Sequence, residues 1–138
     1  MFVWMVLMSC VSAYKTIQRT IEVDSIEAIV DVTALPNVSG WIVAMDIIVY
    51  APRDVEVSIP LKTSEIGSLT IISQGVGGGG ASDGSTITSR SYHLEPDGFG
   101  LQTIPVLKIP YIDKRIHTSG ESKVLHTEEM RFLINRWY

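Results

Sequence analysis

The stretch "WIVAMDIIVY", residues 41–50, is apolar at every position except Asp46. A short apolar run that is rich in β-branched residues is typical of a buried strand. Because both alternating sets of side chains are apolar, we expect neighbours on both faces, as in the centre of a sandwich. A lone carboxylate is costly to bury, so we expect Asp46 to point outward or to pair with an arginine. The candidate partners are Arg19, Arg53 and Arg90.

Strand patterns continue on both sides of this run. Residues 16–23 alternate between apolar and polar side chains, residues 26–35 are β-branched and apolar, and residues 55–59 alternate again. Turn residues separate them, as at Pro36-Asn37. Residues 101–109 predict a further strand, and Pro105 within it favours a sheet edge.

A glycine-rich stretch, "GVGGGGASDGS", occupies residues 75–85. Its first six residues match the dinucleotide-binding fingerprint, which requires a helix to follow. Turn and strand residues follow here, so we interpret the stretch as a long flexible hairpin connection. The segment "TEEMRFLINRWY", residues 127–138, fits a short helix or a strand, and pairing with residues 123–126 across a short turn favours the strand.

Eight or so short strands with turn signals between them predict an all-β fold, a single-domain antiparallel β-sandwich of jelly-roll-like type. We expect the sandwich domain to span residues 15–138, preceded by an apolar segment over residues 1–14.

This leading segment, "MFVWMVLMSCVSAY", allows three interpretations. It could be a secretory leader cut after Ala13, since small residues precede that position, although no basic residue comes before the apolar run. As a helix it spans only about 21 Å, too short to cross a hydrocarbon core of about 30 Å. As a strand it reaches about 46 Å and could pair along a sheet edge.

Composition narrows the function classes. Net charge is −4 and the 11 Lys and Arg residues form no basic run, which argues against nucleic acid as a partner. Hydrophobic residues make up 46% of the chain, and apolar surface of this extent favours a partner subunit. Cys10, the one cysteine, lies in the leading segment, so the sequence predicts no disulfide within the chain.

No residue pattern predicts catalysis, a metal site or a cofactor. The histidines, His93, His117 and His126, do not have the spacing of metal ligands on one helix or strand. No serine has the flanking glycines of a nucleophile elbow. Asn37-Val38-Ser39 is an acceptor sequence for N-glycosylation, which matters only in an exported protein.

The sequence therefore predicts a non-enzymatic structural subunit of an exported assembly, such as a filament, a pilus-like fibre or a virion shell. We expect it to lie outside the cell, at the cell surface or in a virion, and to bind copies of itself or related subunits. Residues 1–23 would form an arm that completes a neighbour's sheet. Any membrane contact would involve residues 1–14.

The alternative is a secreted or membrane-tethered binding module, with residues 75–85 and the turn "EPDGFG", residues 95–100, facing a ligand. The expected interface residues are Phe2, Val3, Trp4, Val6, Leu7, Trp137 and Tyr138.

Overall fold

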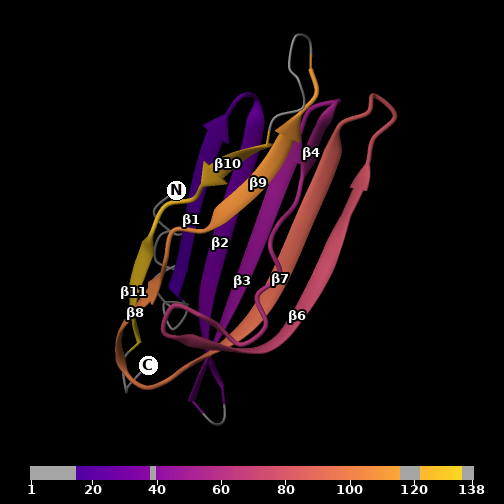
Figure 1. The fold of residues 1–138 in the computed structure, drawn as a ribbon. Coiled ribbons are helices and arrows are strands. Elements are labelled where there is room, and N and C mark those ends of the chain that lie inside the picture. The colour runs from indigo at the N-terminus through magenta and orange to yellow at the C-terminus, as the bar shows by residue number, and fades with distance from the viewer. Residues whose placement is uncertain (1–14, 38–39, 116–121, 135–138) are drawn as a thin grey trace, which may run out of the picture.

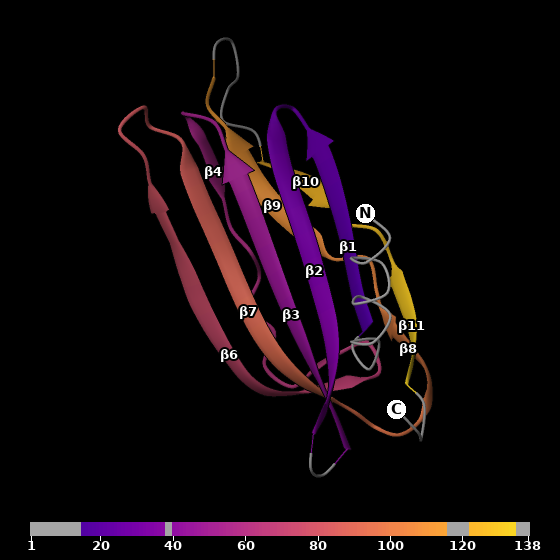
Figure 2. The ribbon, with the colours of Figure 1, turned by 180° about the vertical axis from the view of Figure 1, so that it is seen from behind.

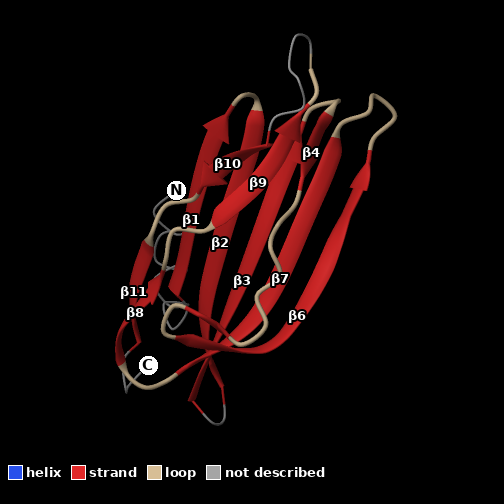
Figure 3. Cartoon of the chain, viewed as in Figure 1, coloured by secondary structure: helices blue, strands red, loops and turns tan. Residues whose placement is uncertain are grey.

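The computed structural model describes residues 15–37, 40–115 and 122–134. Regular structure within these ranges is entirely β (Figure 3), which confirms the predicted all-β class. The strands are β1 (Lys15–Val23), β2 (Ile26–Asn37), β3 (Gly40–Ala51), β4 (Val55–Val57), β5 (Glu65–Ile66), β6 (Leu69–Gly80), β7 (Thr86–Pro96), β8 (Gly100–Ile104), β9 (Lys108–Asp113), β10 (Ser122–His126) and β11 (Met130–Ile134).

These strands form two layers of unequal size. The large layer is a six-stranded antiparallel sheet in the order β1-β2-β3-β7-β6-β5. The small layer consists of a three-stranded sheet, β10-β9-β4, and a two-stranded sheet, β11-β8. Figure 1 shows the small layer lying over one face of the large sheet. The core fills the space between the layers, as in a β-sandwich.

Alternation along the central strands decides which face enters this core. On β3 the side chains from Trp41 to Ala51 are buried at every second position, and the positions between them are half-buried or exposed. β2 alternates in the same way from Ile26 onward. The expectation that residues 41–50 are covered on both faces is therefore wrong. One face enters the core, and no described element covers the other face (Figure 2).

A polar network joins the small layer to the tight turn between β1 and β2. Asp24 and Ser25 have positive φ angles of 53° and 66°, the conformation that hairpin turns of this length require. Tyr111 on β9 donates a hydrogen bond from its hydroxyl to Asp24 Oδ2 at 2.8 Å. Arg115 donates from Nη2 to the carbonyl oxygen of Asp24. These bonds fix the small layer relative to one end of the large sheet.

The single strand predicted over residues 101–109 is two strands in the structure. β8 and β9 lie on either side of Pro105 and belong to different sheets, so residues 101–109 are not one strand. β9 also extends beyond the predicted strand, from Lys108 to Asp113.

The strand interpretation of the C-terminal segment is confirmed for β11. Met130, Phe132 and Ile134 are buried, and Arg131 and Leu133 are exposed. Its expected partner is wrong: β11 pairs with β8, whereas β10, over residues 122–126, pairs with β9.

Candidate functional site

β6 lies near one edge of the large sheet, and most of its residues are exposed. On one side β6 pairs with β7 from Leu69 to Gly80, with a register shift near residue 72. On the other side β5 pairs only with Leu69 and Thr70, and Ile71 donates a backbone hydrogen bond to Ser64. No described strand pairs with residues 72–80 on that side. We call this stretch the free edge of β6.

The sequence of the free edge lacks the charged residues and prolines that protect many natural sheet edges. Residues 72–80 read "ISQGVGGGG", with no charge and no proline. Ile72 and Val76 expose 52% and 73% of their surface. The uncharged run extends over residues 66–82 and is visible in the sequence. The interpretation of residues 75–85 as a flexible connection is wrong for residues 75–80, which belong to β6, whereas residues 81–85 do connect β6 to β7.

The opposite edge of the large sheet, β1, carries an inward-facing charge. Arg19 aligns with Val30, a core residue, so its side chain leaves the sheet on the core side. There its Nε lies 3.5 Å from Glu128 Oε2. An inward charge on an edge strand opposes the addition of another strand. The two edges are therefore unequal, and β6 is the one open to pairing.

The glycines of β6 divide into those that the fold requires and those that it does not. Gly78 has a φ of +127°, and a Cβ at this position would collide with the carbonyl oxygen of Ile87. At Gly75 and Gly79 a Cβ would meet nothing within 4 Å. Their missing side chains leave open space above the sheet. A glycine without a local reason often marks the close approach of another backbone or a ligand.

The turn that closes β6 and β7 is short and well bonded. Ala81 and Ser85 form a backbone hydrogen bond of 2.9 Å across it. Asp83 Oδ1 accepts hydrogen bonds from the Ser85 hydroxyl and backbone N–H, which lower the pKa of Asp83. The turn thus comprises residues 81–85 and holds the end of the free edge in place.

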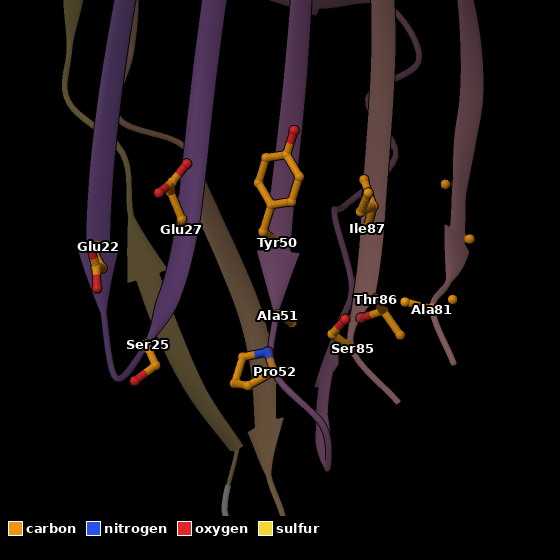
Figure 4. A pocket seen from close by; sticks show the side chains of 13 residues that line it. Glu22, Ser25, Glu27, Tyr50, Ala51, Pro52, Ala81, Ser85, Thr86 and Ile87 are labelled. Atoms are coloured by element: carbon orange, nitrogen blue, oxygen red, sulfur yellow. The ribbon is translucent and has the colours of Figure 1, made fainter. Parts of the chain in front are cut away.

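A cavity of 580 Å³ lies beside this turn on the uncovered face of the large sheet (Figure 4). One row of its lining crosses five strands, since Glu22, Glu27, Tyr50, Ile87 and Gly79 are successive partners in register. Tyr50 is 42% exposed. The Tyr50 ring provides a stacking surface, and the carboxylates of Glu27 on the next strand and Glu22 on the strand beyond provide hydrogen-bond acceptors.

Asp46 lies on the same uncovered face, two residues along β3 from Ile48. The first of the two predicted alternatives, that Asp46 points outward, is confirmed. No ion pair joins Asp46 to Arg19, Arg53 or Arg90. Its partner in register is Asp31 of β2, whose Oδ1 atom is buried and accepts no hydrogen bond. The sequence does not reveal this pair, because register decides which residues of two strands meet.

A second acid, Asp113, has a strong partner. Arg115 donates from Nε to Asp113 Oδ1 at 2.9 Å and from Nη2 to Oδ2 at 2.8 Å. These bonds, together with the Arg115 backbone N–H, lower the pKa of Asp113 to about 2. Burial and the hydrogen bond to Asp24 raise the pKa of Tyr111 to about 12. Both groups serve the network between the layers and lie outside the cavity.

The predicted interface residues, Phe2, Val3, Trp4, Val6, Leu7, Trp137 and Tyr138, lie outside the described residues. Asn37 is the last residue of β2. The other two residues of its acceptor sequence, Val38 and Ser39, lie outside the described residues. The prediction of an arm over residues 1–23 is wrong for residues 15–23, because Lys15–Val23 pairs with β2 of the same chain.

The two loops proposed to face a ligand lie at opposite ends of the sandwich. The turn at residues 81–85 borders the 580 Å³ cavity. Phe99, in the turn after β7, borders a smaller hollow with Gly40 and Trp41, at the other end of β3. One ligand of ordinary size would therefore meet only one of them.

Within the described ranges no three His, Cys, Asp or Glu side chains gather as metal ligands would. His93 is exposed, with Nδ1 3.3 Å from the Ser73 hydroxyl. A search of residues 15–37, 40–115 and 122–134 finds no helix long and apolar enough to cross a membrane.

No protein-family model matches the chain, and no curated protein matches its sequence.

Proposed function

We propose that the chain is a non-enzymatic structural subunit of an exported assembly, such as a filament, a pilus-like fibre or a virion shell. The observation that carries this proposal is the free edge of β6, residues 72–80, which has no charged residue, no proline and no partner strand among the described residues. Added strands gain main-chain hydrogen bonds on such an edge. The protected β1 edge makes the association directional, with β6 as the acceptor.

The proposed donor is the apolar segment of a neighbouring copy, residues 1–14. Neither this segment nor the free edge contains a charged side chain, so pairing desolvates no charged side chain of either strand. The free edge extends about 30 Å, and a donor strand of this length could cover it. The donor has large side chains, including Phe2 and Trp4, whereas the acceptor has glycines with open space above them. Aromatic side chains opposite edge glycines stabilise strand pairs.

Sedimentation velocity of purified protein tests the proposal. Val76→Lys places a charge on the free edge, and we expect it to shift the assembled species to monomer. Leu61→Lys makes the same change at a loop position of 56% exposure and should leave assembly unaffected. A variant that lacks residues 1–14 should also be monomeric. Assembly that persists in both the Val76→Lys and the shortened variant would contradict the proposal.

A second candidate function is a secreted or membrane-tethered binding module. The cavity beside Tyr50 favours it, because an exposed tyrosine with Glu27 on the next strand and Glu22 on the strand beyond suits a ligand with a flat apolar face and hydrogen-bond donors. In this case the wild-type protein should be a stable monomer. Tyr50→Ala should abolish binding in a ligand array without lowering the free energy of unfolding by more than about 1 kcal/mol.

A further inference from the structure

Charge is unevenly distributed over the uncovered face of the large sheet. The arginines of its strands, Arg19 and Arg90, align with the core residues Val30 and Ile47, so both leave the sheet on the core side. The acidic side chains that leave β1, β2, β3 and β7 on the uncovered face are Glu22, Glu27, Asp31, Asp46 and Glu95. None of these acids takes part in an ion pair within the described residues. A surface of one charge sign attracts ions of the opposite sign.

The 580 Å³ cavity lies in this face, and Tyr50 is the middle residue of the row that crosses five strands. Its partner in register on β2 is Glu27, with about 5 Å between the two Cβ atoms. Its partner on β7 is Ile87, and Figure 4 shows all three side chains on the same side of the sheet. Gly79 follows on β6, where a Cβ would meet nothing within 4 Å. Tyr50 therefore has an acid on one side, and an apolar residue and open space on the other.

The ring and the carboxylates of the cavity both favour a cation. An ionised carboxylate only accepts hydrogen bonds, and those from charged donors are roughly twice as strong as hydrogen bonds between neutral groups. The face of an aromatic ring attracts a cation because its quadrupole is negative there. Among the described residues no lysine or arginine lines the cavity, and Arg53, which follows the lining residue Pro52, forms no ion pair with Glu22 or Glu27. A bound cation would neutralise these two acids.

We propose that this cavity binds a small, flat organic cation, such as an aryl amidine or an aryl guanidine. The cationic group lies toward Glu27, the ring stacks on Tyr50, and the apolar edge of the ligand faces Ile87. A cavity of this size is typical of small-molecule sites. This ligand class rests on the second candidate function, binding in the cavity beside Tyr50, and adds the charge that the ligand carries.

Benzamidine and benzamide are suitable probes, because they have the same ring and a similar size but only benzamidine is a cation at neutral pH. In titrations followed by amide NMR shifts in roughly 0.1 M salt, we expect benzamidine to bind the wild-type protein about three- to fivefold more tightly than benzamide. The shifts should be concentrated at Glu27, Tyr50 and Ile87. The difference between the probes should shrink as salt is added, because salt screens the exposed carboxylates.

Glu27→Gln removes the charge and keeps the shape of the side chain. It should lower the benzamidine affinity to that of benzamide and leave the benzamide affinity unchanged. Glu95→Gln is the matched control, since it removes the same charge from the same face about 26 Å along β7 from Ile87. This separation exceeds the Debye length of about 10 Å in roughly 0.1 M salt, so neither affinity should change. Tyr50→Leu should weaken both probes, because both stack on the ring.

Equal affinities of the two probes for the wild-type protein would overturn the cationic ligand and leave the cavity as a binding site. A Glu27→Gln variant that still prefers benzamidine would have the same consequence. If neither probe shifts the amides of Glu27, Tyr50 and Ile87, the result contradicts both the cationic ligand and the second candidate function.

Discussion

At the scale of single residues, the two buried tyrosines show how position decides what a hydroxyl contributes. Tyr92 and Tyr111 are 2% and 3% exposed, but only Tyr111 donates a hydrogen bond, to Asp24. The sequence identifies neither role, because Asp24 is 87 residues away from Tyr111 in the chain. Asp46 illustrates the same point, since its outward direction follows from alternation but its neighbour Asp31 does not.

Replacing each tyrosine by phenylalanine should change the free energy of unfolding differently. Tyr111→Phe removes a hydrogen bond to a carboxylate that is itself 42% exposed, and we expect the free energy of unfolding to fall by about 1 kcal/mol. Tyr92→Phe removes an unsatisfied hydroxyl, so the same quantity should stay constant or rise by up to about 1 kcal/mol. Urea denaturation measures both. Equal destabilisation by the two changes would show that Tyr92 has a partner.

The Asp113–Arg115 pair makes stability depend on pH at the acid end. The pKa of Asp113 is about 2 in the folded chain and about 3.9 in an unfolded one. The folded state therefore binds fewer protons between these values, and the stabilisation is complete above about pH 4 and lost as the pH falls through 2. Asp113→Asn should flatten this dependence. An NMR titration that gives Asp113 a midpoint near 4 would contradict the account.

At the scale of elements, β1 and β6 show which parts of the fold the sequence predicts. Alternation identifies β1 and places Ile17 and Ile21 toward the core, as the structure confirms. The glycines of β6 conceal a strand, because they carry no side chains whose alternation could be read. Pairing between the distant strands β8 and β11 also escapes the sequence, since nothing local to either strand specifies its partner.

Glycine-to-alanine changes in β6 should separate the two kinds of glycine. Gly78→Ala forces a residue with a side chain into a φ of +127° and against the Ile87 carbonyl, so we expect a loss of about 1–3 kcal/mol in the free energy of unfolding. Gly79→Ala meets open space and should be neutral or stabilising by up to about 1 kcal/mol. Thermal unfolding of the two variants compares them directly, and similar melting temperatures would contradict the described path of β6.

At the scale of the whole molecule, the two layers differ in extent, and this difference creates the candidate interface. The small layer covers the core face of the large sheet around β2, β3 and β7, where the buried side chains gather. Toward β6 the same face becomes exposed, as Val76 shows. The sequence predicts the two-layer class from strand number and turn spacing. It cannot predict strand order, which depends on contacts between distant segments.

Amide hydrogen exchange across residues 72–80 tests the central claim, that β6 accepts a strand from another copy. The measurement compares protein above and below the concentration at which it assembles. We predict that amides of this stretch that point away from β7 exchange more slowly in the assembled protein, while Leu61 and its neighbours in the exposed loop exchange equally fast in both states. Equal exchange of residues 72–80 in the two states would contradict the account.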